Sequence, residues 1–167
     1  MGQVTKLELR HQVCFALYAA SRAVTDVYRP ILEELGLTYP QYLVLLVLWE
    51  RDPDPATVKD LGAALELDSG TLSPLLKRLA AAGLVTRSRS VRDERVVEVA
   101  LTAAGRALRD RVGEVPRQVA EATGLSEDEL LSLRHTLTRI TDAVHHQQAG
   151  VHQDQQDQQQ RQQQKEN

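Results

Sequence analysis

The chain has 167 residues and a single cysteine, Cys14. One cysteine excludes a disulfide framework within the chain and a zinc site built from several cysteines. Three roles remain for the thiol: a buried filler, a reactive group, or a partner for a thiol on another molecule. As a reactive group, the thiolate of Cys14 would attack the O–O bond of a peroxide.

A second group of residues able to do chemistry lies between residues 69 and 95. This segment carries six basic side chains against two acidic ones, a net charge of +4, whereas the whole chain has −3 and the remainder therefore −7. Positive charge gathered in one module is typical of nucleic-acid binding. The candidates for DNA contact in this segment are Ser69, Thr71, Ser73, Lys77, Arg78, Arg87, Arg89, Arg92 and Arg95.

Two short helices are expected to position the first half of this set. Thr57 can cap a helix over residues 58–65, and a turn over residues 68–71 precedes the next helix. Pro74 is compatible with that second helix if it begins near Thr71. Its apolar side comprises Leu72, Leu75, Leu76 and Leu79. The opposite side keeps hydroxyl groups and cations, the side chains that a recognition helix presents to bases and phosphates.

A charged hairpin is expected to follow. Residues 95–101 alternate between two faces, as a strand does, and residues 87–95 form a tip rich in arginine. A basic hairpin of this size suits a neighbouring minor groove. Helix, turn, helix and hairpin together predict a winged helix-turn-helix over about residues 57–101. A helix-turn-helix that binds another protein remains an alternative for this pattern.

The rest of the chain is expected to be helical, so the fold class is mainly α with a small β-hairpin wing. A helix over residues 6–29 is disturbed near Pro30, and a capping box from Thr38 to Gln41 starts an almost wholly apolar, central helix. Thr102 caps a helix that is bent or broken near Pro116. The last helix repeats apolar residues like a coiled-coil seam, at Leu130, Leu133, Leu137, Ile140 and Val144.

Composition sets the domain limits and the compartment. Apolar residues make up 42% and charged residues 26%, which is typical of a soluble globular protein. Residues 147–167 are dominated by glutamine without periodic apolar positions, so we expect a disordered tail after a folded domain over residues 5–146. The longest apolar run, residues 42–49, is too short to cross a membrane, and no signal segment is recognised. We expect a cytoplasmic protein without a metal or cofactor.

Several motifs resemble the MarR family of bacterial regulators. They are the run from Asp68 to Leu79, Gly83-Leu84-Val85, Arg92-Asp93-Glu94-Arg95 and Leu101-Thr102-Ala103-Ala104-Gly105. The resemblance covers about residues 7–145. It implies a homodimer, held by its N- and C-terminal helices, on a pseudopalindromic double-stranded DNA operator. It also implies that Asp93 steadies Arg95, which enters the minor groove.

The N-terminal third is similar to the organic hydroperoxide resistance regulators of that family. The similarity rests on Leu9, on the run from Gln12 to Arg22 around Cys14, on Tyr28, and on the run from Leu37 to Leu43 around Tyr39. It implies a repressor in which Cys14 senses an organic hydroperoxide while Tyr28 and Tyr39 donate hydrogen bonds to its sulfur. Two phenol donors favour a thiolate. A pocket for the organic tail is expected from Phe15, Leu17, Tyr18 and Val24.

Helix geometry adds an inference about subunits. If residues 14–28 form one helix, Cys14 and Tyr28 lie about 21 Å apart along its axis. Contact between them then requires the first helix of a second subunit, running in the opposite sense. A sulfenic acid at Cys14 has no second cysteine in its own chain. We therefore expect it to react with a low-molecular-weight thiol, form a sulfenamide or over-oxidise, and repression to be lifted by movement of the helices.

Two further functions remain open. A thiol peroxidase would turn over substrate, although the chain lacks a second cysteine for recycling. A MarR-type regulator released by a non-covalent aromatic ligand would leave Cys14 incidental. A sensor consumes peroxide stoichiometrically, whereas a thiol peroxidase consumes it continuously. Release of DNA by an aromatic ligand in a variant that lacks Cys14 would identify the ligand-controlled regulator.

Overall fold

A computed structural model describes the backbone of residues 8–165 and the side chains of residues 8–147. The chain divides into two compact units, residues up to 122 and residues from 123 onward. The first unit contains η1 (Leu9–His11), α1 (Val13–Glu33), α2 (Tyr39–Arg51), β1 (Ala56–Thr57), α3 (Val58–Leu65), α4 (Ser69–Ala81), β2 (Val85–Arg89), β3 (Val97–Leu101), α5 (Ala103–Val112) and most of α6 (Val115–Thr123). The second unit is mainly α7 (Glu127–Lys165).

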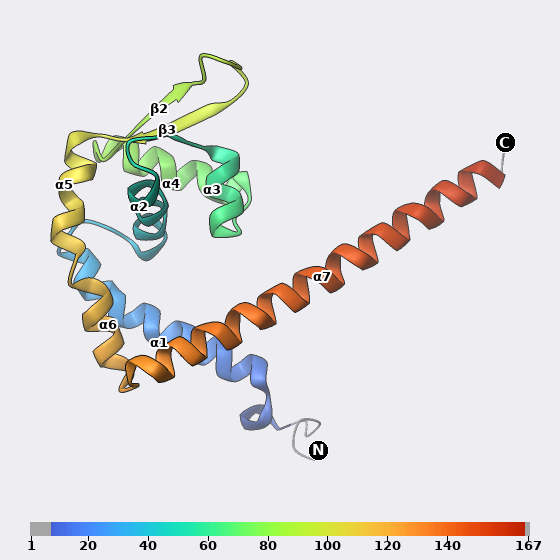
Figure 1. Ribbon diagram of the computed structural model, residues 1–167, viewed down its shortest axis with the longest axis horizontal. Helices are drawn as coiled ribbons and strands as arrows, with labels where there is room; N and C mark the ends of the chain where they lie inside the picture. Colours follow the sequence, from blue (N-terminus) through green and yellow to red (C-terminus); the bar gives the residue numbers. More distant parts are fainter. Residues whose placement is uncertain (1–7, 166–167) are drawn as a thin grey trace. The chain divides into compact units, whose positions relative to one another are not determined.

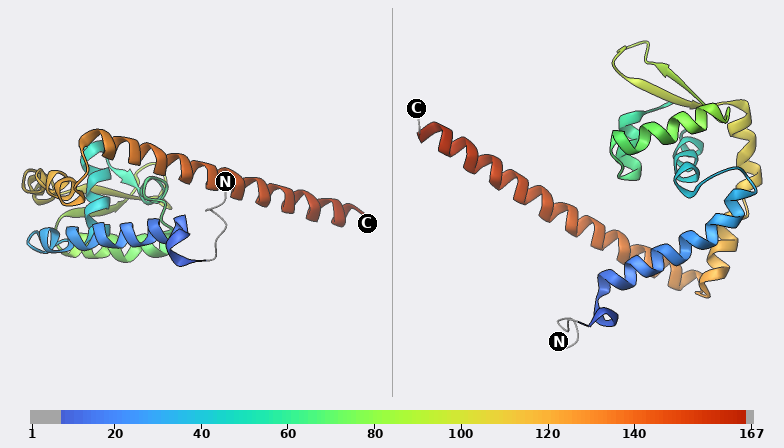
Figure 2. Two further views of the ribbon diagram at one scale, coloured as in Figure 1. Left: turned by 90° about the horizontal axis from the view of Figure 1, so that it is seen from below. Right: turned by 180° about the vertical axis from the view of Figure 1, so that it is seen from behind.

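The winged helix-turn-helix predicted from the sequence is present. Strands β2 and β3 pair in antiparallel register from Val85 opposite Leu101 to Arg89 opposite Val97. Their hairpin extends beyond α2, α3 and α4 in Figure 1 and in the right view of Figure 2. A third strand, β1, completes the sheet in the order β1-β3-β2. Strand β1 was not predicted, because a strand of two residues is too short to display alternation.

The core is centred on α2, as its apolar composition predicted. Its buried side chains include Leu45 and Leu48, and the helix contacts α1, α3, α4 and α5 (Figure 1). Recognition-helix candidate α4 contributes three leucines that are fully buried, Leu72, Leu76 and Leu79. Leu75, which was assigned to the same apolar side, remains partly exposed. This packing fixes α4 against the scaffold and leaves its other side facing outward.

The predicted helix starts are confirmed by hydrogen bonds. The Thr38 backbone N–H donates to Gln41 Oε1 over 2.8 Å at the start of α2. Thr57 caps α3, where its Oγ1 accepts from the Asp60 backbone N–H over 3.0 Å. These caps satisfy backbone donors that have no partner inside the helix.

Two proline predictions were wrong. Helix α1 continues through Pro30 to Glu33, because packing of its last turn, including the fully buried Leu32, outweighs the missing hydrogen bond. Helix α4 begins at Ser69 rather than near Thr71, so Pro74 lies beyond the first turn. Gly70, whose carbonyl loses its helical donor to Pro74, is exposed and can be hydrated.

The helical segments after the sheet differ in detail from the expectation. The break expected near Pro116 falls between α5 and α6, after Val112, and Pro116 occupies the first turn of α6, where no N–H partner is needed. Helix α7 continues to Lys165, through the segment where we expected disorder. Glutamine is a good helix former. A segment without periodic apolar residues has no face to bury, but it can still be helical. No described helix combines the length and apolarity needed to cross a membrane.

The start of α5 is joined to the end of α4 by a close backbone approach. The Thr102 backbone N–H donates to the Leu84 carbonyl over 3.1 Å, and Thr102 Oγ1 donates to the Gly83 carbonyl over 2.6 Å. A Cβ atom on Gly105 would lie only 2.1 Å from the Leu84 oxygen. The indole of Trp49 donates to the Gly105 carbonyl over 2.9 Å. The Leu-Thr-x-x-Gly motif thus fixes α5 against the winged module.

Substitution Gly105→Ala is expected to destabilise the chain by about 2–3 kcal/mol, because the methyl group meets backbone that cannot yield without moving a neighbouring element. The measurement is urea unfolding at one fixed protein concentration.

Gly113→Ala is the matched control, since its new methyl would lie 3.7 Å from the nearest described atom in ordinary helical backbone. It should change the free energy of unfolding by less than about 1 kcal/mol. Equal effects of the two substitutions would contradict the close-approach explanation.

Candidate sensor site and nucleic-acid interface

Three tyrosines from α1 and α2 form one aromatic cluster. The rings of Tyr28 and Tyr39 have centroids 4.6 Å apart, and Tyr42 lies 6.0 Å from Tyr28. Burial, followed by repulsion from the Tyr39 and Tyr42 phenolates, raises the pKa of Tyr28 to about 12. Burial also raises the pKa of Tyr39. Both phenols therefore remain neutral O–H donors at physiological pH. The structure brings together the two tyrosines that the resemblance singled out.

Cys14 lies apart from this cluster. It is the second residue of α1, and its side chain is exposed. Residues 13–33 form one helix, so Cys14 and Tyr28 of the same chain are about 21 Å apart along the axis. Fourteen helical residues turn through almost four complete revolutions, which leaves the two side chains within about 40° of the same face.

The four residues expected to surround an organic tail do not form one pocket within a chain. Phe15 and Tyr18 are exposed, Leu17 is half-buried, and Val24 packs against the core. Phe15 lines a hollow of about 540 Å³ beside η1. A separate hollow of about 240 Å³ is lined by Thr25, Arg29, Glu33, Leu37, Thr38, Tyr39 and Pro40. The second hollow places open space next to one of the paired tyrosines.

Helix α4 presents most of its predicted contact residues to the outside. Ser69, Thr71, Lys77 and Arg78 are exposed, whereas Ser73 is half-buried. The Thr71 hydroxyl donates to Asp68 Oδ2 over 2.8 Å and the Thr71 backbone N–H donates to Asp68 Oδ1 over 3.0 Å. Thr71 is thus held by the helix cap. The sequence analysis assigned no role to Asp68, although an Asp three residues before Thr71 is a recognisable N-cap signal.

The tip of the wing is ordered by Asp93. Its carboxylate accepts from Arg95 Nε over 3.1 Å, from Arg95 Nη2 over 3.2 Å and from the Arg95 backbone N–H over 3.0 Å. The side-chain bonds, followed by the backbone bond, lower the pKa of Asp93. The Arg95 side chain is still 90% exposed. A planar guanidinium held in a fixed orientation and open to solvent suits insertion into a groove.

The other arginines of the wing differ in their freedom. Arg89 donates to the Glu94 carbonyl over 3.1 Å and so helps to close the hairpin. The side chains of Arg87 and Arg92 are exposed. Ser90 is buried, and its Oγ accepts from the Arg92 backbone N–H over 3.3 Å. The structure therefore brings the predicted basic residues of α4 and the hairpin into one compact unit.

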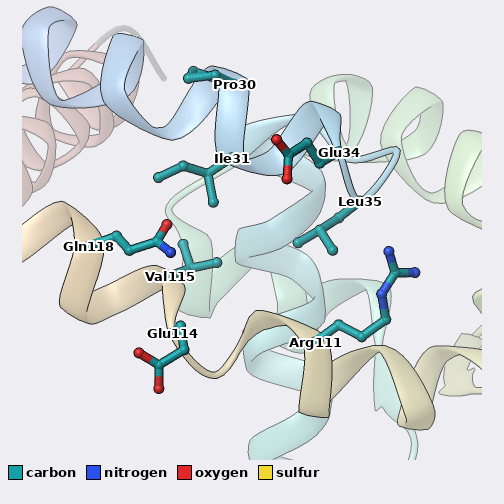
Figure 3. A pocket seen from close by; sticks show the side chains of 8 residues that line it. All are labelled: Pro30, Ile31, Glu34, Leu35, Arg111, Glu114, Val115 and Gln118. Carbon is teal, nitrogen blue, oxygen red and sulfur yellow. The ribbon is translucent and has the colours of Figure 1, made fainter.

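A further hollow, of about 310 Å³, lies where the end of α1 faces α5 and α6 (Figure 3). Ile31, Leu35 and Val115 supply its apolar lining, and its charged groups are Glu34, Arg111 and Glu114. None of the residues lining it is aromatic, and none was among the candidate site residues predicted from the sequence. Among the residues that the structure describes, no cluster of metal-ligating side chains occurs.

Comparison with known proteins identifies the family. The family model "Transcriptional regulator SarA/Rot" matches residues 26–112. The organic hydroperoxide resistance transcriptional regulator of Bacillus subtilis is 43% identical over 83% of this chain and 93% of its own length. The chain belongs to the MarR family of transcriptional regulators. The HTH-type regulator TtmR of Methylorubrum extorquens is 48% identical over 86% of this chain and 73% of its own length.

A solved relative extends the comparison of this MarR-family chain to structure. Reduced AbfR, a Staphylococcus epidermidis protein solved bound to DNA, is 36% identical and matches with a TM-score of 0.68 over 81% of this chain and 94% of that one. The shared architecture confirms the family and the winged-helix fold expected from the sequence.

The buried tyrosine cluster predicts a loss of stability at high pH. The unfolded-state pKa of tyrosine is about 10 and that of folded Tyr28 about 12, so the contribution of neutral Tyr28 is complete below pH 10 and is lost as the pH rises through about 12. Tyr28→Phe should therefore lower the alkaline loss of stability, measured as the free energy of unfolding between about pH 9 and pH 12.

An alkaline loss that is identical in the wild type and in Tyr28→Phe would contradict the origin assigned to it.

Proposed function

We propose that this chain acts as a homodimeric transcriptional repressor that binds a pseudopalindromic DNA operator, senses organic hydroperoxides through Cys14 and then releases the DNA. The observation that carries the proposal is the pairing of Tyr28 with Tyr39 of α2, because Tyr28 lies on the face of α1 that also carries the exposed Cys14 and both phenols stay neutral. The name of the B. subtilis relative and the DNA-bound state of reduced AbfR support the same function.

The sensor is completed by the α1 helix of a second subunit. Cys14 and Tyr28 share a helical face but are separated by about 21 Å. An antiparallel pair of α1 helices brings the Cys14 end of one helix beside the Tyr28 end of the other. Apolar side chains at the N-terminal end of α1, including Val13, Phe15 and Tyr18, are exposed in the single chain and suit such a contact. Exposed apolar residues of α7, such as Ile140 and Val144, suit the paired C-terminal helices.

The chemistry at Cys14 is a two-electron oxidation. Its thiolate, stabilised by O–H donation from Tyr28 and Tyr39 of the partner subunit, attacks the terminal oxygen of the hydroperoxide. An S–O bond forms, the O–O bond breaks, and the departing alkoxide takes up a proton to leave as an alcohol. A low-molecular-weight thiol then condenses with the sulfenic acid, forming a mixed disulfide and releasing water. The added group displaces the tyrosines and the helices that carry them.

DNA contact is assigned to α4 and the wing of each subunit. Ser69, Thr71, Ser73, Lys77 and Arg78 of α4 face the major groove, and the Asp93-held Arg95 enters the adjoining minor groove. Arg87, Arg89 and Arg92 neutralise phosphates, which makes the affinity depend steeply on salt. When the spacing of the two recognition helices changes, they no longer fit the two half-sites of the operator together, so the DNA is released and repression ends.

The chain is a sensor rather than an enzyme in this proposal. A thiol peroxidase needs a path that returns its oxidised cysteine to the thiol at every turnover, and the sequence holds no second cysteine to begin one. With a thiol reductant supplied in excess, consumption of hydroperoxide by the sensor should accordingly stop near one equivalent per Cys14. A peroxidase would continue to consume it when a thiol reductant is supplied in excess.

Cys14→Ser should keep its DNA affinity and fail to release DNA on treatment with cumene hydroperoxide plus a small thiol, whereas the wild type loses about tenfold or more in affinity, the size of a typical allosteric coupling. Fluorescence anisotropy of an operator duplex measures the binding, and mass spectrometry of Cys14 measures its oxidation.

Arg95→Ala provides the control. It should weaken DNA binding in the reduced and oxidised states alike, so the ratio between the two affinities persists. DNA release by Cys14→Ser under the same treatment would refute sensing through this thiol and favour a non-covalent effector.

A further inference from the structure

We infer that Trp49 is a positioning residue that couples the sensor tyrosines to the recognition helix. The inference rests on the proposed function, because it concerns how a change at Tyr28 and Tyr39 reaches DNA. Trp49 is the only tryptophan of the chain, and it is buried at the C-terminal end of α2. Nothing in the peroxide chemistry itself requires it.

The first half of the connection is a continuous series of aromatic contacts. Tyr39 contacts Tyr28 with centroids 4.6 Å apart, Tyr28 lies 6.0 Å from Tyr42, and Tyr42 lies 6.4 Å from Trp49 in an edge-to-face arrangement. Tyr42 and Trp49 are two turns apart on α2, so both rings lie on one side of the helix. Displacement of the sensor pair therefore reaches the packing around the indole through Tyr42.

The second half is the backbone junction at Gly105. The indole N–H of Trp49 donates to the Gly105 carbonyl over 2.9 Å, a buried bond that spans 56 residues of sequence. Gly105 is pressed against the Leu84 carbonyl so closely that no Cβ fits between them. Leu84 in turn accepts from the Thr102 backbone N–H. A shift of the indole is thus transmitted to backbone rather than absorbed by a flexible side chain.

Leu84 sits where the two DNA-contacting elements meet. Its backbone N–H donates to the Leu79 carbonyl in the last turn of α4 over 3.0 Å, and the next residue, Val85, begins β2. Movement at Leu84 therefore changes the placement of α4 and the wing together. Two packed arrangements of this junction, one for each state of the sensor, would satisfy the physical requirement for coupling between distant sites.

The test compares Trp49→Phe with Val112→Ala in the full-length protein. Phenylalanine keeps an aromatic ring next to Tyr42 but cannot donate to Gly105. Val112 is buried in the same core, on α5, and takes no part in the connection. Each variant is assayed for operator affinity before and after cumene hydroperoxide and a small thiol, and for Cys14 modification by mass spectrometry.

We expect Trp49→Phe to bind DNA nearly as tightly as the wild type when reduced and to be modified at Cys14 to the same extent. Its loss of affinity on oxidation should be about threefold to tenfold smaller than that of the wild type, the factor that corresponds to one buried hydrogen bond. Val112→Ala should retain the full loss. Equal losses in Trp49→Phe and the wild type would overturn the inference.

Trp49 emission in the wild type keeps the inference testable if Trp49→Phe does not fold. Oxidation should change the emission spectrum with the same time course as DNA release, and it should not do so in Cys14→Ser. Unchanged emission during DNA release would overturn the role of Trp49. A wild type that is oxidised at Cys14 yet keeps its DNA would instead refute the proposed function, so the two failures are distinguishable.

Discussion

Helix α1 separates Cys14 from Tyr28 by about 21 Å along a single axis, and no side-chain rearrangement within one chain closes that distance. The C-terminal half of the helix is fixed, because Val27, Tyr28, Ile31 and Leu32 pack on the core. The N-terminal half leaves apolar side chains and the cysteine exposed. The helix therefore carries a thiol at one end and, at the other, Tyr28, which is paired with Tyr39 of α2, so a complete sensor needs two copies of the chain. In such a sensor, chemistry at sulfur acts directly on the contact between subunits.

The winged module is suited to receive such a signal because its helices are held together by close packing and buried hydrogen bonds. Three fully buried leucines hold α4 on the scaffold. The Thr102–Leu84 hydrogen bond, the Gly105–Leu84 approach and the Trp49–Gly105 hydrogen bond fix α5 against the end of α4. Close-packed junctions of this kind move as units rather than deforming gradually. At the far end of the module, Asp93 holds the Arg95 guanidinium in one orientation.

Local signals in the sequence predicted much of this arrangement. The pairs Thr38–Gln41 and Thr57–Asp60 predicted helix starts because a cap is a contact between residues three apart. Alternation over residues 95–101 predicted the wing. Prediction from the sequence was wrong where packing against distant residues decides, as at Pro30, where burial of the last turn of α1 keeps the helix intact. It also missed β1, the cap role of Asp68 and the Trp49–Gly105 bond, whose partners lie 56 residues apart. The assignment of Cys14 and the DNA-contacting residues to their roles stays a prediction.

The most direct test of a sensor shared between subunits uses mixed dimers. Each mixed dimer contains only one Cys14 and only one Tyr28–Tyr39 pair. One mixture pairs a Cys14→Ser chain with a Tyr28→Phe/Tyr39→Phe chain, so that the remaining cysteine faces the remaining tyrosines across the interface. The other pairs a wild-type chain with a chain carrying all three substitutions, so that the cysteine and both tyrosines lie on one chain. Purified mixed dimers are treated with limiting cumene hydroperoxide, and the rate of Cys14 oxidation is measured by mass spectrometry. A site built across the interface predicts fast oxidation in the first mixture and slow oxidation in the second; the reverse order would contradict it.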